Sequence, residues 1–501
     1  MVKTGDKTRP RSVKAQFDDS FSATASGGAV LVERVIRRLG LRKLMDRFLP
    51  ERSGQYSSAE ICDQLVAGLL CGGKGFQAAE TLRRDRSLRR IFGHENVAEE
   101  ATVWRAICDM AGLKQRSFAD TYKPAGAVQP SLDLQGNETK PTAHHRIVAD
   151  TPEAMPDERR RMLGDLAGQV AVRCAQALAN RDLRLAGFVP VHGDGTALEV
   201  TGDCFDAART DYKGNKSLQL MTLAAGPVYI GQRLLPGASD EGTALADLLK
   251  TSGKTVGKIA PTASVLALLD AAFAEKDVVE QLIDLKWNYI ICANQQRQLL
   301  ERLASEITEP EWTSTGADAG RKWSASGVAT MSHLPQDWSQ VQKVIVRRYR
   351  QADELEATWH YSFLYTDLTE RMLPKKQIKH YGFAQYIWML YSTKQGRENT
   401  YKTWLSDLGG HNPASGRLGA SEMMCYMQAI AANIHAVISQ RVMPKQEKGI
   451  RHWRFVRDYI RLAGRLVMES GKTLVVKLAG ADIAEKARRW WLEAYAATGR
   501  I

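Results

Sequence analysis

The stretch from residue 188 to residue 200 constrains the fold of this chain most strongly. An apolar run ends there in a polar turn that carries Asp194 between Gly193 and Gly195, and a second short strand is predicted at residues 197–201. This layout would hold one carboxylate rigidly at a strand end, with glycines that leave room for a metal ion or a phosphate beside it. The alternative is plain turn chemistry, in which aspartate and glycine only shape the turn.

Downstream of this stretch the chain alternates predicted strands and helices. Apolar runs of strand length occur at residues 218–225, 228–235, 265–269 and 289–293. Helices are predicted at residues 156–180, 240–250 and 275–285. Consecutive strands followed by strand–helix–strand units predict a mixed α/β fold, with a mixed sheet that helices cover.

The charge balance indicates a polyanionic partner. Lys and Arg total 69 against 56 Asp and Glu, which gives a formal net charge of +13 spread along the whole chain. Nucleic acid fits this excess better than a membrane surface, because no basic amphipathic anchor and no bilayer-spanning apolar run is found. Seven scattered cysteines without metal-ligand spacing favour reduced thiols and an intracellular, cytoplasmic protein.

Shifts in composition divide the chain into regions. A capping box at Ser57–Glu60 and helical spacing make the first of them all-helical, and its arginines could dock in a DNA groove or simply form a solvated face. The expected regions are a flexible arm at 1–27, a helical DNA-binding domain at 28–112, a linker or long loop at 113–157, a core at 158–312 and 368–445, a β-rich insertion at 313–367 and a basic C-terminal region at 446–501.

Three later segments carry basic or aromatic residues of interest. The insertion alternates strands at 322–330, 341–350 and 358–366, and the basic residues of the second strand are Lys343, Arg347, Arg348 and Arg350. Residues 381–405 are predicted to form one long helix that contains Tyr391, Lys394, Arg397, Glu398 and Lys402. On that helix the two lysines would share the face of Glu398, while Arg397 would point about 100° away. Arginines between 451 and 465, at three- and four-residue steps, would line a further helix face.

Three carboxylates could converge on one site. Asp194 and Asp270 each end a predicted strand and lie 76 positions apart, and Glu398 follows 128 positions later in a helix. Such a cluster needs cations, and oxygen ligands of this kind suit Mg²⁺ or Mn²⁺. Two ions could then support phosphodiester chemistry. Alternatively, Asp194 caps a turn, Asp270 caps the next helix, and Glu398 pairs with a lysine on its own helix.

At these residues the sequence resembles the DDE transposases of bacterial insertion sequences, in the branch that has a β-strand insertion before the last acid. His192-Gly-Asp194-Gly-Thr196 is similar to that branch's Asp-x-Asp-x-Thr, with His192 in place of the leading aspartate. The segment 265–273 matches the context of the second acid without its arginine and glycine. Tyr391, Lys394 and Glu398 keep the spacing of Tyr-x-x-Arg-x-x-x-Glu, with Lys for Arg; Leu405 stands where a lysine is usual, and Lys402 is the nearest substitute.

The resemblance implies a ribonuclease-H-like catalytic core that binds the terminal inverted repeats of an insertion sequence. It implies cut-and-paste transposition through metal-dependent DNA cleavage and strand transfer, with two Mg²⁺ ions, or Mn²⁺ as a substitute, on Asp194, Asp270 and Glu398. The partners would be double-stranded DNA at the element ends and the target, and a second copy of the chain in a synaptic homodimer. The enzyme would act in the bacterial cytoplasm, associated with the nucleoid when it is bound to DNA.

The expected DNA-contacting residues are those of the long helix and the insertion: Tyr391, Lys394, Arg397, Lys402, Lys343, Arg347, Arg348, Arg350 and Trp323. Trp323 could stack on a distorted base during a hairpin step, or it could only pack the strands together. Two other functions stay open: a related DNA nuclease without strand transfer, and an inactive DNA-binding derivative that acts as a repressor.

Overall fold

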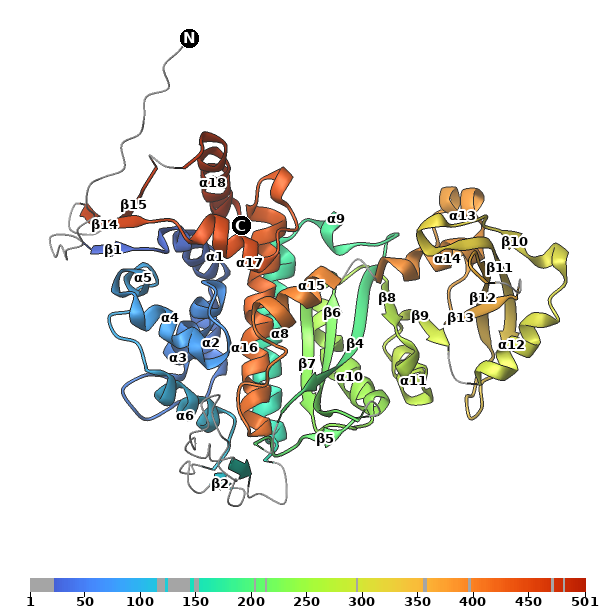
Figure 1. Ribbon diagram of the computed structural model, residues 1–501, viewed down its shortest axis with the longest axis horizontal. Helices are drawn as coiled ribbons and strands as arrows, with labels where there is room; N and C mark the ends of the chain where they lie inside the picture. Colours follow the sequence, from blue (N-terminus) through green and yellow to red (C-terminus); the bar gives the residue numbers. More distant parts are fainter. Residues whose placement is uncertain are drawn as a thin grey trace, which may run out of the picture.

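A long sheet runs through the molecule and carries helices on both faces. The computed structural model describes residues 22–114, 122–124, 145–147, 153–201, 204–211, 214–293, 296–354, 358–394, 398–469, 473–480 and 483–501. Within these ranges the helices from both chain ends gather on one side of the sheet, and the β-rich segment extends the other side (Figure 1). The predicted mixed α/β fold is confirmed.

The main sheet contains both parallel and antiparallel pairs. Its order is β10-β11-β12-β13-β9-β8-β4-β6-β5, and β7 also pairs with β6. Only β8 is parallel to its neighbours, β4 and β9, and every other pair in this sheet is antiparallel. The strands are β4 (Val189–Glu199), β5 (Arg209–Thr210), β6 (Lys216–Ala225), β7 (Val228–Leu235), β8 (Val265–Leu269), β9 (Asn288–Ala293), β10 (Thr313–Ser314), β11 (Trp323–His333), β12 (Gln342–Gln351) and β13 (His360–Thr366).

Both faces of the central strands are buried, and alternate side chains enter different hydrophobic cores. The residues of β8 that join the larger core are Val265, Ala267 and Leu269. Those that join the smaller core, beneath helix α14 (Phe383–Ser392), are Leu266 and Leu268. Because strand side chains alternate between the two faces, this division identifies the face of the sheet on which each neighbouring residue lies.

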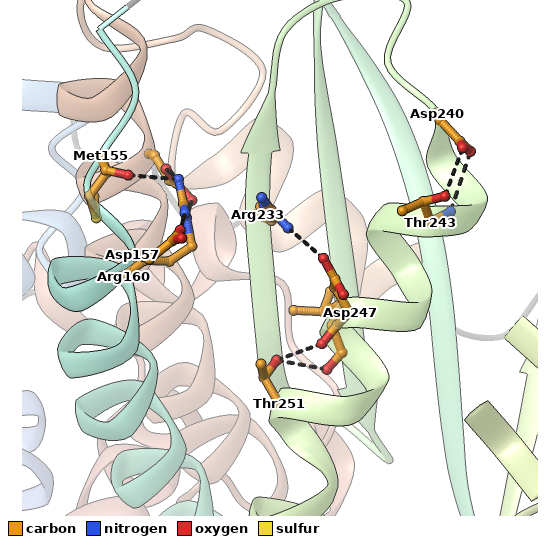
Figure 2. A network of polar contacts seen from close by, with 10 residues as sticks. Met155, Asp157, Arg160, Arg233, Asp240, Thr243, Asp247 and Thr251 are labelled. Carbon is orange, nitrogen blue, oxygen red and sulfur yellow. Dashed lines mark hydrogen bonds and ion pairs between the residues drawn. The ribbon is translucent and has the colours of Figure 1, made fainter. Parts of the chain in front are cut away.

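Three helices fix the edge of the sheet formed by β7. These helices are α8 (Asp157–Ala177), α10 (Glu241–Ile259) and α16 (Leu418–Val437). The Asp240 carboxylate caps α10, since it accepts hydrogen bonds from the backbone N–H groups of Gly242 and Thr243 (Figure 2). Two turns later Asp247 pairs with Arg233 of β7 at 3.4 Å, so the N-terminal half of α10 is tied to the sheet (Figure 2).

The N-terminal helices pack against α8 and α16 and share the larger core with them. The predicted capping box is confirmed, because the Ser57 side chain accepts from the Glu60 backbone and the Glu60 side chain accepts from the Ser57 backbone. These helices are α1 (Val30–Leu39), α2 (Leu41–Phe48), α3 (Ser58–Leu70), α4 (Ala78–Arg84), α5 (Arg86–Ile91) and α6 (Glu100–Met110).

The two ends of the chain meet in a small second sheet. Strand β1 (Ser22–Thr24) pairs with β14 (Gly464–Glu469), which pairs with β15 (Thr473–Leu478). Helix α18 (Glu485–Ala497) follows, and Figure 1 shows it beside α1. Strands β2 (Tyr122–Pro124) and β3 (His145–Ile147) pair within the predicted linker, most of which lies outside the described residues.

The remaining described helices lie around the main sheet. They are α9 (Asn180–Leu183), α11 (Lys276–Asp284), α12 (Arg297–Ser305), α13 (Lys375–Tyr381) and α15 (Glu398–Lys402). Helix α17 (His452–Phe455) lies instead against α3 and α16. None of the helices in the described ranges is both long enough and apolar enough to cross a membrane. None of the seven cysteines is in a disulfide.

The predicted turn at Asp194 is wrong. Strand β4 runs unbroken through it, because β6 supplies a partner at every position, including Leu223 for Gly193 and Met221 for Gly195. The two glycines serve packing instead, and the space beside them is filled. A Cβ on Gly193 would lie 2.8 Å from Leu269, and one on Gly195 would lie 2.6 Å from the Glu241 carboxylate.

The predicted long helix at 381–405 is also wrong. Helix α13 ends at Tyr381, and α14 extends from Phe383 to Ser392. Gly382 separates the two helices, because its φ of 76° is not helical. Helix α15 then begins at Glu398 and passes at Lys402 into a π-helix, η8 (Thr403–Asp407). A constant helical spacing therefore does not relate Lys394 to Glu398.

The predicted basic helix face near the C-terminus is wrong as well. Helix α17 passes into a short π-helix, η11 (Val456–Ile460), and Arg465 lies in β14. Acidic partners neutralise the arginines that do lie on this segment: Arg451 pairs with Asp407, Arg454 with Glu447, and Arg457 with Asp458. These carboxylates come from three different segments, which the sequence period could not show.

Candidate active site

Strand register brings Asp194 and Asp270 together. In the parallel pair β4–β8, Val189 lies opposite Val265 and His192 lies opposite Leu268, a constant offset of 76 residues. The same offset takes Asp194 to Asp270, which directly follows β8. Asp270 makes no side-chain capping bond to the turn that follows it.

Both aspartates lie on the face of the sheet that α14 covers. The core beneath α14 contains Phe188, which precedes β4, and Leu266 and Leu268 of β8. Asp194 and Asp270 are an even number of residues from these positions, so their side chains lie on the same face of the sheet. A cavity of about 330 Å³ opens there. Its lining residues are Asp194, Asp270, Arg321, Arg347, Trp388, Tyr391, Ser392, Lys394 and Tyr401.

The end of α14 supplies two partners for Asp270. The Tyr391 hydroxyl donates to Asp270 Oδ1 at 3.2 Å and to the Leu269 carbonyl at 3.3 Å, and burial raises the pKa of this hydroxyl. The Lys394 ammonium forms an ion pair with the other oxygen, Oδ2. Tyr391 and Lys394 therefore hold the Asp270 carboxylate from two sides, and both were expected at the site as DNA contacts.

Asp194 is difficult to ionise in this setting. Burial raises its pKa to about 6; the Lys394 charge works against this rise, whereas the negative charges of Asp270 and Glu241 add to it. Glu241 begins α10, accepts from Gln219 Nε2 at 2.7 Å and lies beside Gly195. A carboxylate pair with one raised pKa is typical of a site that binds a cation or a proton.

The third predicted acid is described only through the backbone. Glu398 is the first residue of α15, and the structure does not describe its side chain. Tyr401 of the same helix lines the cavity, so α15 reaches the site. Arg397 lies outside the described residues, and Lys402 is exposed at the end of α15.

The basic residues of β12 divide between the two faces of the sheet. Lys343 and Arg347 face α14: the Lys343 ammonium lies 4.7 Å from the ring centre of Phe383, and the Arg347 guanidinium lies 4.7 Å from that of Trp388. Only Arg347 of this pair lines the cavity.

Arg348 and Arg350 lie on the opposite face, both above the Trp359 ring. Arg348 is also fixed by two hydrogen bonds to the Glu309 carboxylate, at 2.8 and 2.5 Å. The four basic residues therefore do not form one surface.

Trp323 is already stacked within the protein. Its ring lies 4.5 Å from that of Tyr349 with 20° between the planes, and the guanidinium groups of Arg321 and Arg347 lie 5.0 and 5.1 Å from its centre. Sequence reasoning missed Arg321, Trp388, Ser392 and Tyr401 as cavity residues. Trp388 could have been found, because it lies one helical turn before Tyr391.

The donor set fits a divalent cation. Two carboxylates line one cavity, and burial, together with the negative charges of Asp270 and Glu241, raises the pKa of Asp194. Among the side chains that the structure describes, no group of three His, Cys, Asp or Glu residues forms a metal site. Asp194 and Asp270 would therefore need a third ligand from outside that set, such as Glu398 or a DNA phosphate.

Comparison with known families agrees with this geometry. Residues 189–434, from the start of β4 almost to the end of α16, match the family model described as transposase DDE domain. The matched segment contains both aspartates, the β-rich strands and α15. A search of curated proteins found no match to the chain. Residues 189–434 are therefore identified as a transposase DDE domain.

Proposed function

We propose that this protein is a cut-and-paste transposase that binds the terminal inverted repeats of a bacterial insertion sequence. It would cleave DNA at the element ends and join them to a target by metal-dependent phosphodiester chemistry. One observation carries the proposal: Asp194, within β4, and Asp270, directly after β8, lie two residues beyond the last paired positions of these adjacent parallel strands and line one cavity. The transposase match over the same residues supports it.

We also propose that the core has a ribonuclease-H-like topology. The strand order β9-β8-β4-β6-β7 supports this assignment, because its parallel half is β9, β8 and β4 and its antiparallel half is β4, β6 and β7. In such a sheet, ligands gather at the carboxyl ends of the parallel strands, where Asp270 lies.

Glu398 would complete the acid triad, since it lies one helical turn before the cavity residue Tyr401. Asp194, Asp270 and Glu398 would hold two Mg²⁺ ions. When bound, such ions activate the attacking oxygen and stabilise the leaving oxygen of a phosphodiester. The chain itself orients Asp270 through Tyr391 and balances its charge through Lys394.

End recognition would fall to residues 28–112. Nine arginines of this region are exposed, which supports a role in contacting phosphates: Arg37, Arg38, Arg42, Arg47, Arg83, Arg84, Arg86, Arg90 and Arg105. Strand transfer requires two element ends, so a homodimer would form in the synaptic complex, in the bacterial cytoplasm and on the nucleoid.

The experiment uses a plasmid that carries the DNA flanking both sides of the coding sequence. With Mg²⁺ the wild-type protein should excise and join the enclosed segment. Asp194→Asn and Asp270→Asn, which keep the side-chain shape, should each lower cleavage by orders of magnitude, and the double variant should lose little more. Asp277→Asn is the matched control, because Asp277 is exposed on α11.

The products separate the alternatives. Cleavage without joined products would identify a nuclease without strand transfer. Binding of the flanking DNA without cleavage by the wild-type protein would identify an inactive derivative that acts as a repressor. Normal cleavage by both asparagine variants would overturn the assignment of the acids.

A further inference from the structure

The cavity that contains the two aspartates also has a basic wall. Arg321, just before β11, and Arg347 of β12 both line it. Burial lowers the pKa of Arg347 to about 10, and the positive charge of Arg321 adds to this lowering. Two like charges held together beside an open cavity need an anion to balance them.

This basic wall is held in a fixed geometry. The Arg347 guanidinium lies between two rings, 4.7 Å from the centre of Trp388 and 5.1 Å from that of Trp323, and Arg321 lies 5.0 Å from the latter. The turn that carries Arg321 is closed by the Trp323 N–H, which donates to the Asp318 carbonyl at 2.9 Å. Lys322 within it adopts a φ of 55°, a strained conformation for a residue other than glycine.

Two donors at the wall lack partners. Among the described residues, the Nε of Arg347 and the Nε1 of Trp388 are buried without a hydrogen-bond acceptor. The Asp318 carboxylate lies 3.6 Å from Arg321, and its charge works against the lowered pKa of Arg347. Arg348 on the opposite face differs in its other two nitrogens, because its Nη1 and Nη2 atoms donate to the Glu309 carboxylate, although its Nε is also buried without an acceptor.

We propose that Arg321, Arg347 and the Trp388 indole N–H form a phosphate subsite that binds one backbone phosphodiester of DNA. This proposal rests on the proposed function, in which the aspartates act on a neighbouring phosphodiester of the same strand. Guanidinium groups match phosphate geometry and donate charge-assisted hydrogen bonds. A stacked base is not the occupant, because Tyr349 and the two guanidinium groups already cover Trp323.

The test measures DNA binding alone, in EDTA, with a 30-base-pair duplex of arbitrary sequence. The slope of log affinity against log salt concentration counts the phosphates that the protein neutralises, at about 0.9 for each. The double variant Arg321→Gln/Arg347→Gln should reduce this slope by about one contact. The control Arg348→Gln/Arg350→Gln removes the same charge from the same sheet, but from the face opposite α14.

Two further variants keep the test independent of folding. Arg321→Gln alone replaces an exposed side chain and should weaken DNA binding at low salt severalfold. Trp388→Phe removes only the indole N–H that lacks an acceptor, and it should also weaken DNA binding. An equal loss of slope in the cavity-facing and control double variants would overturn the subsite, as would no loss in the cavity-facing one. If the wild-type protein binds DNA but does not cleave it, the proposed function is contradicted. The comparison of DNA binding by the variants still decides whether the phosphate subsite exists.

Discussion

At the residue scale, the ion pair between Lys394 and Asp270 shapes the charge of the site before any metal ion binds. The ammonium lies where a cation bound to Asp270 would carry its charge, and it also lowers the pKa of Asp194. The prediction that Lys394 and Glu398 share one helix face depended on an unbroken helix at 381–405. Because α14 ends at Ser392, Lys394 lies beyond the helix, and its ammonium group forms an ion pair with Asp270.

Removing this lysine should strengthen metal binding by the DNA-free protein. Lys394→Met leaves Asp270 without its counter-charge, so Mn²⁺ should bind roughly fivefold more tightly, the equivalent of about 1 kcal/mol. Loss of Lys394 also raises the pKa of Asp194 above its value of about 6, so the titration is done at pH 8, where the carboxylate is ionised. Binding is followed by the electron paramagnetic resonance signal of free Mn²⁺.

Lys402→Met serves as the control, because Lys402 is exposed and does not line the cavity. Its Mn²⁺ affinity should match that of the wild type. Unchanged or weaker binding by Lys394→Met would show that the lysine does not compete with a cation.

Tyr391 provides a second residue-scale prediction. Tyr391→Phe removes the hydroxyl that donates to Asp270 and keeps the ring. The fold should therefore persist, while Asp270 loses one of the two side chains that orient its carboxylate. Cleavage should fall by about tenfold, as expected for a residue that orients a metal ligand. The contradicting result is wild-type cleavage by this variant at limiting Mg²⁺.

At the element scale, apolar period and turn residues predicted the strands well. The runs at 218–225, 228–235 and 265–269 correspond to β6, β7 and β8. Glycine at 193 and 195 misled the prediction, because a local reading cannot see that β6 continues the ladder past them. It also could not show that β13 pairs with β9 and joins the β-rich strands to the main sheet.

Glycines in two helices should respond oppositely to alanine, because only one of them lies at a close contact. A Cβ on Gly68 of α3 would lie 1.9 Å from the Ala78 carbonyl oxygen of α4, whereas one on Gly164 of α8 would meet nothing within 4 Å. Gly68→Ala should therefore destabilise the protein by about 2 kcal/mol or more, and Gly164→Ala should stabilise it by roughly 0.5–1 kcal/mol. Thermal unfolding midpoints that move in the same direction would contradict this account of the packing of α3 on α4.

At the scale of the whole molecule, segments from both chain ends meet on α16. His452 begins α17, and the centre of its ring lies 5.2 Å from that of His435 in α16. Its Nε2 donates a hydrogen bond at 3.2 Å to the carbonyl of Leu70, the last residue of α3. Leu70 and His452 are 382 residues apart. No sequence period connects such distant positions, so this junction could only be found in the structure.

Acid should weaken this junction. Burial lowers the pKa of His452 from 6.5 to about 4, even though the Leu70 carbonyl and Asp407 favour its charged form, and burial also lowers the pKa of His435. The unfolded chain therefore binds more protons below pH 6.5, so the free energy of unfolding should fall as the pH drops from 6.5 toward 4. His452 alone accounts for about 2 kcal/mol of this fall at pH 5.

The measurement compares urea unfolding at pH 7 and pH 5 for the wild type and for His452→Gln, whose side chain stays neutral. The variant should lose about 2 kcal/mol less between the two pH values than the wild type, whatever its stability at pH 7. His411→Gln removes an exposed histidine and should keep the wild-type pH dependence. An equally steep fall in His452→Gln and the wild type would place the acid sensitivity outside the junction of α3, α16 and α17.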